Sequence, residues 1–190
     1  MKSLLILSLI MISCGQVTDL LDSDGISSGE HRIFISSANY TGNLGNFSGA
    51  DEKCKDLAST AGLTRNYIAV ISTSVSSAAA RLDLTGPIFM IDSEDNKVLV
   101  SSSESDLFSG GNLVNDITIT ELGTSRISGS VWSGSTDAGG TSITGHCLNW
   151  SSNASSEDAR AGDVADALGG WIDRRDITCD SSLPIYCISN

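Results

Sequence analysis

Basic residues are scarce in this chain of 190 residues. Its 11 lysines and arginines are outnumbered by 23 aspartates and glutamates, so the formal net charge at pH 7 is −12. A strongly acidic chain is repelled by the phosphates of nucleic acids and by anionic lipid headgroups. The composition therefore argues against nucleic acid as a partner and permits basic protein partners.

A long apolar run is missing as well. The most apolar stretch, LLILSLIMI at 4–12, is much shorter than the roughly 20 residues that a transmembrane helix needs. It follows the positively charged Lys2 and ends just before a small residue, Ser13. This order is typical of a signal peptide, which we predict over 1–13.

The four residues at 11–14, MISC, resemble a bacterial lipobox. In that motif the cysteine thiol is acylated and the cysteine becomes the new N-terminus. We therefore predict that Cys14 carries lipid, such as palmitate, and anchors the chain in a membrane, since each buried methylene group contributes roughly 0.8 kcal/mol. Met11 stands where a lipobox usually has leucine. An ordinary signal peptide, cut nearby and with Cys14 incidental, is the alternative.

Lipidation of Cys14 leaves an even set of four cysteines: Cys54, Cys147, Cys179 and Cys187. Outside the reducing cytoplasm such a set predicts two disulfides. Four cysteines allow three pairings, and their spacing does not select one of them.

The chain divides into an anchor segment and one domain. Residues 14–30 are acidic and rich in glycine and serine, a composition typical of a flexible tether. We predict that this lipidated tether precedes a single folded domain over 31–190.

The predicted elements of this domain are short, apart from one helix. The helix spans 50–63, with a capping box of Ser48 and Asp51 at its start and Gly62 at its end. Its core-facing residues are Ala50, Cys54, Leu57, Ala58 and Ala61. Short strands, one clear helix and much loop predict an α+β fold with antiparallel strands. Strands are expected at 32–37, 66–73, 128–135, 146–150 and 183–189, a hairpin at 87–102 with its turn near Asp95, short helical turns at 76–82 and 105–111, and mostly loop at 151–178.

Histidines are too few for an evident metal or catalytic site. The two, His31 and His146, lie far apart in the sequence, and a structural zinc site needs four ligands. No motif places a nucleophile beside a base. We therefore expect no metal, no cofactor, no catalytic residue and no enzymatic activity. The three tryptophans, which favour a core position over a binding platform, are Trp132, Trp150 and Trp171.

Five ordered motifs resemble the endostatin domain found at the C-terminus of certain collagens, and they run through nearly all of 31–190. They are SGADEKCKDLASTAGL at 48–63, PIFMID at 87–92 with DLFSG at 106–110, VWSGSTDAGG at 131–140, CLNW at 147–150 and LPIYCISN at 183–190. With a lipobox ahead of it, the domain is similar to the leptospiral endostatin-like outer-membrane lipoproteins.

This resemblance implies a disulfide-stapled, C-type-lectin-like domain that binds host proteins such as laminin, fibronectin, plasminogen or complement factor H. It also implies a nested pairing of Cys54 with Cys187 and of Cys147 with Cys179. We therefore predict a lipoprotein of the bacterial outer membrane that is exposed at the cell surface and binds host matrix and complement-regulatory proteins. A periplasm-facing envelope lipoprotein with a structural or unknown binding role is the alternative.

The chain departs from the endostatin pattern at its ligand sites. Only His31 and Asp83 fall on positions of the endostatin zinc site, and two ligands do not hold structural zinc. Only Arg65 and Arg81 fall in the region of its heparin-binding patch, so heparin binding is not expected. The calcium motif of sugar-binding C-type lectins is absent from the sequence.

Two long polar stretches, 110–127 and 151–178, are the expected recognition loops. The second carries a mixture of arginines and acidic residues over 157–176, which suits salt-sensitive contact with a charged protein. We predict that this region contacts the partner, and we assign no individual residue to binding.

Overall fold

A computed structural model describes residues 21–190 except Gly111. The predicted signal peptide, 1–13, and the lipidation site, Cys14, lie outside the described residues. Within the part of the chain that the structure describes, no helix combines the length and the apolar character needed to cross a membrane.

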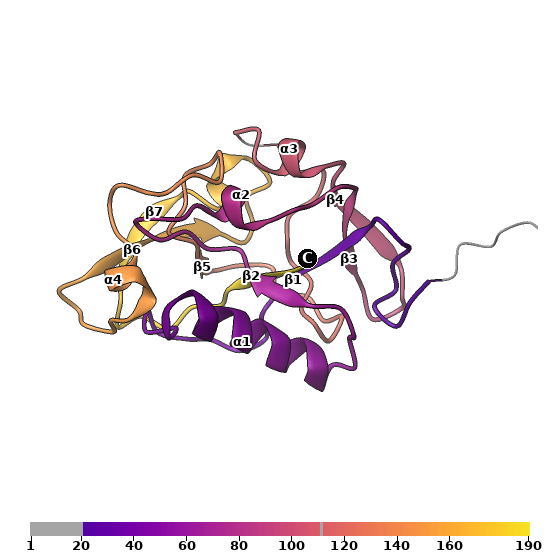
Figure 1. The fold of residues 1–190 in the computed structure, drawn as a ribbon, viewed down its shortest axis with the longest axis horizontal. Coiled ribbons are helices and arrows are strands. Elements are labelled where there is room, and N and C mark those ends of the chain that lie inside the picture. The colour runs from indigo at the N-terminus through magenta and orange to yellow at the C-terminus, as the bar shows by residue number, and fades with distance from the viewer. Residues whose placement is uncertain (1–20, 111) are drawn as a thin grey trace, which may run out of the picture.

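A five-stranded sheet forms the centre of the domain, with the strand order β2-β8-β1-β3-β4. The first and last strands of the chain therefore lie side by side, and Figure 1 shows the C-terminus in the middle of the fold. Strand β1 pairs with β3 in parallel, whereas the other neighbouring strands of this sheet are antiparallel. The strands are β1 (His31–Ile35), β2 (Tyr67–Ala69), β3 (Ile88–Ile91), β4 (Lys97–Ser101) and β8 (Tyr186–Ser189).

A second, three-stranded antiparallel sheet has the order β5-β6-β7. Its strands are β5 (Ser130–Trp132), β6 (Asp158–Asp163) and β7 (Arg175–Thr178), with a 3₁₀ turn η1 (Gly169–Trp171) between the last two. The prediction of mostly loop over 151–178 therefore missed the two strands of this stretch. The sequence of β6, DARAGD, turns small residues inward, so it lacks the β-branched and aromatic residues by which a strand is usually recognised. Gly162 is required there, because a Cβ atom would lie 1.8 Å from the carbonyl oxygen of Trp171.

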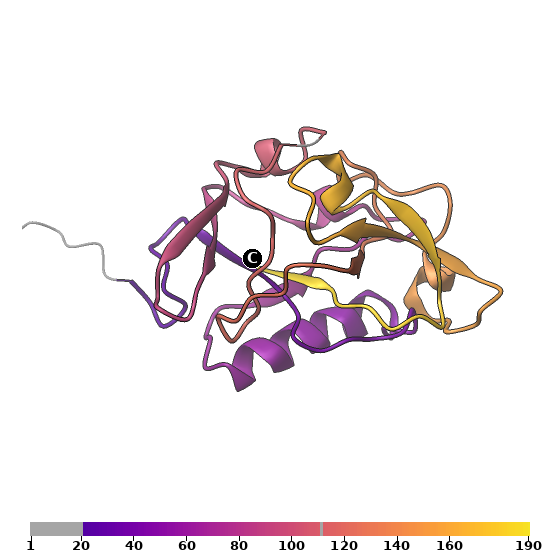
Figure 2. The same ribbon diagram turned by 180° about the vertical axis from the view of Figure 1, so that it is seen from behind.

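Helix α1 (Asn46–Thr60) is the one long helix among the described residues and lies along one side of the domain (Figure 2). It begins four residues before the predicted start, after Gly45 in the left-handed region, and it has no side-chain cap. The predicted capping box is wrong, since Ser48 lies inside the helix. Gly62 ends the helix as expected: its φ is 78°, and the amide of Leu63 donates to the carbonyl of Ala58.

Three further helical segments are one turn long: α2 (Ala78–Arg81), α3 (Glu104–Leu107) and α4 (Cys147–Trp150). The first falls within the helical turn predicted at 76–82, and the second overlaps the turn predicted at 105–111 but begins one residue earlier. The third replaces the strand that was predicted at 146–150, so that prediction is wrong.

Alternation along the central strands builds a core on both faces of the five-stranded sheet. In β1, Ile33 and Ile35 join one buried cluster, whereas Phe34 joins the other, which contains the inner face of α1. All three tryptophans are fully buried, as predicted, and Leu57 is partly buried. The chain thus forms a mixed α+β domain with two apolar clusters.

The N-terminal boundary of the domain lies earlier than predicted. Asp24 and Ile26 are both fully buried, and the Asp24 carboxylate accepts hydrogen bonds from the Thr64 amide at 2.7 Å and the Tyr67 hydroxyl at 2.7 Å. The prediction of a flexible tether is therefore wrong over 22–30. Its glycines and serines form turns that pack on the domain.

Candidate functional site

Two disulfides connect the four cysteines of the domain, as the even cysteine count predicts. Cys54 of α1 bonds Cys187 of β8, with a Cα–Cα distance of 5.5 Å, and Cys147 bonds Cys179 with a distance of 5.6 Å. The pairs are those that the endostatin resemblance implies. Each bond joins segments that are far apart in the sequence.

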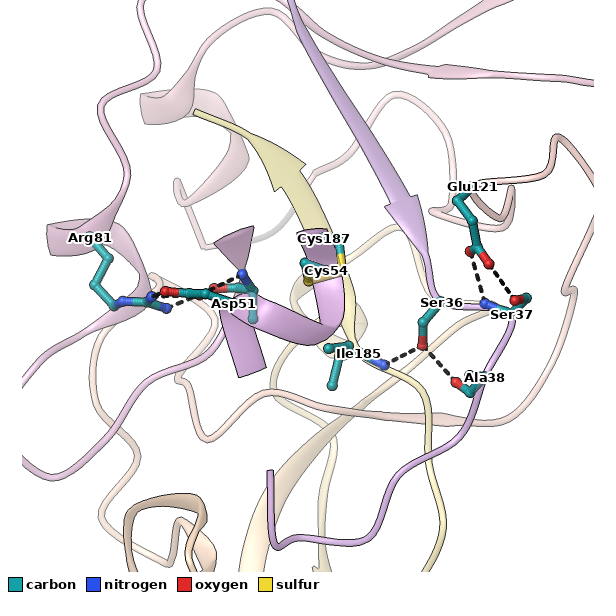
Figure 3. The surroundings of a disulfide bond; sticks show 10 residues. Ser36, Ser37, Ala38, Asp51, Cys54, Arg81, Glu121, Ile185 and Cys187 are labelled. Atoms are coloured by element: carbon teal, nitrogen blue, oxygen red, sulfur yellow. Dashed lines mark hydrogen bonds and ion pairs between the residues drawn. A yellow bond between two sulfur atoms is a disulfide. The ribbon is translucent and has the colours of Figure 1, made fainter. Parts of the chain in front are cut away.

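The surroundings of the first disulfide are held by charged and polar side chains (Figure 3). Asp51 accepts a hydrogen bond from the Ala69 amide at 2.9 Å and forms an ion pair with Arg81 at 2.7 Å. On the other side, the Ser36 hydroxyl accepts from the Ile185 amide and donates to the carbonyl of Ala38. The helix is thus held against the sheet by polar contacts as well as by the disulfide bond.

Two arginines of the predicted recognition region, Arg160 and Arg175, form ion pairs inside the domain. Arg160 forms ion pairs with Asp173 and Asp176, and Arg175 pairs with Asp163 at 3.0 Å. Burial by itself lowers the pKa of Arg160, but hydrogen bonds with the two aspartates outweigh it and raise that pKa above its ordinary value. These ion pairs connect β6 with β7 and with the segment just before β7.

His31 and Arg65, which fall at endostatin-like ligand positions, also have internal partners, whereas Asp83 is exposed. The Nδ1 atom of His31 lies 2.8 Å from the carbonyl oxygen of Ser189, and its Nε2 atom accepts from the Thr85 amide at 3.3 Å. Arg65 pairs with Asp22 at 2.6 Å. Among residues 21–190 without Gly111, no three or more His, Cys, Asp or Glu side chains converge as a metal site would require.

Segment α4 has the most unusual backbone of the described chain. Its four residues, Cys147, Leu148, Asn149 and Trp150, have φ angles of 49°, 52°, 56° and 65°, so they form one left-handed turn. Left-handed helical conformation costs an L-residue about 1–2 kcal/mol. No sequence propensity predicts such a run, which is why the sequence reads more readily as a strand.

Tertiary contacts hold this turn in place. Cys147 is fixed by its disulfide, and the buried indole of Trp150 donates from Nε1 to the carbonyl oxygen of Ser72 at 2.7 Å. The side-chain oxygen of Asn149 accepts from the amide of Ser74 at 2.8 Å. Because its neighbours on either side are fixed, Leu148 points outward, with 61% of its surface exposed.

A pocket of about 390 Å³ lies beside the turn, lined by Ser74, Thr144, Gly145, His146, Leu148, Asn149, Ser156, Glu157 and Asp158. Burial lowers the pKa of His146, and a hydrogen bond to the Gly134 backbone only partly opposes this. Burial thus favours the neutral imidazole, whose Nε2 atom is buried without a hydrogen-bond partner among the described residues. The formal charges of the pocket come from Glu157 and Asp158.

Exposed aliphatic residues are found among the residues that line this pocket and directly next to them in the chain. Leu148 lines it, and Val75 and Ile143, which are 88% and 100% exposed, each follow or precede a lining residue in the chain. These residues were not predicted from the sequence, because the expected recognition loops were chosen for their length, polarity and charge. The available signal was a single aliphatic residue within a run of small polar ones, as in SVSS at 74–77 and SITG at 142–145.

The sequence matches no model of a known protein family and no curated protein. The resemblance to endostatin-like domains therefore rests on the five ordered motifs and on the pairing of the cysteines.

Proposed function

We propose that this chain is a non-enzymatic lipoprotein of the bacterial outer membrane, exposed at the cell surface, whose C-type-lectin-like domain binds host matrix and complement-regulatory proteins. One observation carries the proposal: an endostatin-like series of motifs follows a lipobox, and the domain's cysteines are paired in the nested way that the series implies. Laminin, fibronectin, plasminogen and factor H are the proposed partners.

The architecture supports a binding role. The core is closed by adjacent first and last strands and by the Cys54–Cys187 bond. Such a frame allows surface segments to vary without unfolding the domain, and binding residues are commonly carried on segments of this kind.

Binding is tested with the purified full-length chain in detergent against immobilised laminin, fibronectin, plasminogen and factor H, with serum albumin as the control surface. Saturable binding to at least one of the four, and none to albumin, is the expected result. Absence of binding to all four would overturn the host-binding part of the proposal.

Anchoring is tested separately with Cys14→Ala. The variant lacks the thiol that is acylated, so we expect it to lose lipid labelling and to move from the detergent phase into aqueous extracts. A variant that partitions like the wild type would contradict the lipobox interpretation.

Protease treatment of intact cells then decides orientation. A surface protein is digested, whereas a periplasm-facing lipoprotein is protected until the outer membrane is permeabilised. Protection would replace the proposed surface role by the periplasmic alternative.

A further inference from the structure

We propose that the pocket beside α4 binds a lysine or arginine side chain of a protein partner, with the partner's neighbouring aliphatic residues packing on Val75, Ile143 and Leu148. The inference deepens the proposed function, since it names the chemistry by which a protein would be recognised and the surface that recognises it. This surface lies at the end of the domain where α4 and β6 are found, far from the β3–β4 hairpin (Figure 1).

The charge of the pocket selects a cation. Glu157 and Asp158 both line it, and neither carboxylate has a hydrogen-bond or ion-pair partner within the described part of the chain. By contrast, the nearby Asp176 is occupied by Arg160 and by the hydroxyl of Thr144. A basic side chain entering the pocket would meet two acceptors that the domain itself leaves free, in a chain whose net charge of −12 attracts it from a distance.

The exposed aliphatic residues near the pocket favour a protein partner over a small cation. Leu148, 61% exposed, lines the pocket, and Val75 and Ile143, 88% and 100% exposed, are the chain neighbours of the lining residues Ser74 and Thr144. Apolar side chains gathered at one place on a surface mark interaction sites more often than scattered ones do. A free metal ion or polyamine would leave these side chains in water. A peptide segment in which aliphatic residues flank a lysine would cover them.

The pocket is also held rigid before any partner arrives. The left-handed turn that presents Leu148 is fixed by the Cys147–Cys179 bond and by the Trp150 contact with Ser72. Interfaces gain affinity when their contact residues are already ordered, because less conformational entropy is lost on binding.

The test uses the isotope-labelled full-length chain in detergent and NMR titration with the acetylated, amidated tripeptide Leu-Lys-Leu. We expect saturable shifts of the amides of Leu148, Asn149, Glu157 and Asp158. The peptides Leu-Glu-Leu and Gly-Lys-Gly should produce much smaller ones, since each lacks one half of the recognised chemistry. Equal shifts with all three peptides, or shifts confined to other residues, would overturn the proposal.

Paired variants distinguish binding at the pocket from attraction by the net negative charge of the whole chain. Glu157→Gln with Asp158→Asn should weaken tripeptide binding about tenfold. The matched control, Glu52→Gln with Asp56→Asn, removes the same charge from exposed positions on α1 and should change affinity less than about twofold. Equal losses in the two pairs would show that net charge alone attracts the peptide and would refute the site.

The tripeptide assay contains no host protein, so the two proposals fail separately. Tripeptide binding at the pocket without binding to any host protein would refute the proposed function alone. Host-protein binding that is unchanged in Glu157→Gln with Asp158→Asn would refute this inference as the mode of host recognition and leave the proposed function in place.

Discussion

The two disulfides of this domain join very different kinds of structure. Cys54–Cys187 connects a regular helix to a regular strand, and the residues around it, Asp51, Arg81 and Ser36, have hydrogen bonds or ion pairs of ordinary length. Cys147–Cys179 holds one end of a left-handed turn that L-residues disfavour. The same covalent bond therefore reinforces a preferred local conformation in one region and maintains a disfavoured one in the other.

This difference suggests a division of roles. We expect the first region to contribute more to the free energy of unfolding, and the second to lose part of its contribution to the strained turn that presents Leu148 beside the acidic pocket. Backbone strain is found most often at functional sites, where the surrounding structure fixes it. The comparison can be tested by measuring what each region contributes to the free energy of unfolding.

Removing the first disulfide should have the largest effect. The double variant Cys54→Ala with Cys187→Ala loses the bond between residues separated by 133 positions in the sequence. The unfolded chain then gains conformational entropy, which by itself lowers the free energy of unfolding by about 5 kcal/mol. Denaturant titration of the oxidised full-length chain measures this loss. A loss below about 2 kcal/mol would contradict the assignment of stability to this region.

Removing the second disulfide should cost less than loop length predicts. For a separation of 32 residues the entropic contribution is about 4 kcal/mol, but release of the turn returns part of the cost of its left-handed residues. We expect a net loss of about 2–3 kcal/mol, with faster hydrogen exchange at the amides of Trp150 and Ser151. Losses equal to those of the first pair, with unchanged exchange at the turn, would remove the distinction between the regions.

Asp24 sharpens the comparison, because it secures the sheet beside α1 through Tyr67 and Thr64. Asp24→Asn should lower the free energy of unfolding at neutral pH by about 2 kcal/mol, since bonds to a charged acceptor are lost. Burial raises the pKa of Asp24, but bonds from Thr64, Tyr67 and Arg65 outweigh it and bring that pKa below its ordinary value of 3.8.

The depressed pKa fixes the sign of the pH dependence. In the wild type this contribution is fully present above pH 3.8 and is lost as the pH falls through the lower folded-state pKa. The free energy of unfolding of Asp24→Asn should therefore fall less steeply than that of the wild type as the pH is lowered. Denaturant titrations from neutral pH to about pH 3 measure this difference. The exposed Asp83→Asn is the control and should shift stability by about 0.5 kcal/mol or less. Parallel pH curves for wild type and Asp24→Asn would contradict the role given to Asp24.

Relaxing the left-handed turn should have the smallest effect, and in the opposite direction. Asparagine tolerates positive φ better than leucine does, so Leu148→Asn should raise the free energy of unfolding by about 1 kcal/mol while weakening tripeptide binding. Leu168 has almost the same exposure, 63% against 61%, but an ordinary φ of −90°. Leu168→Asn should change stability by about 0.5 kcal/mol or less. Equal effects of the two substitutions would show that the turn stores no strain.

Much of the fold could be predicted from local sequence patterns. Residues close together in the chain determine four of its features: the spacing of apolar residues along α1, the glycine that ends this helix, the hairpin turn near Asp95, and the alternating strands β1 and β8. Strand β6 escaped the same reasoning, because its inward positions are alanine and glycine and its pairing partners determine its conformation.

The candidate site was harder to predict for a related reason. Glu157 and Asp158 were within the region selected for its charge, but Arg160 and Arg175, two of the three arginines of that region, form ion pairs within the domain. Val75 and Ile143 each stand alone among small polar residues, a local pattern that is compatible with exposure but does not place either residue near the pocket. Which side chains remain free depends on contacts between distant segments, such as that between Ser74 and Asn149, and these are visible only in the folded domain.

The sequence by itself determined the α+β class, the acidic character, the burial of the three tryptophans and the presence of two disulfides, because composition and short-range periodicity govern these properties. Only the tertiary structure decided that 22–30 belongs to the domain, that β1 and β3 run parallel, and that CLNW forms a left-handed turn. The physical reason is common to all three. Each conformation is weakly favoured or disfavoured by its own residues and becomes stable only through partners supplied by distant parts of the chain, such as Tyr67 for Asp24 and Cys179 for Cys147.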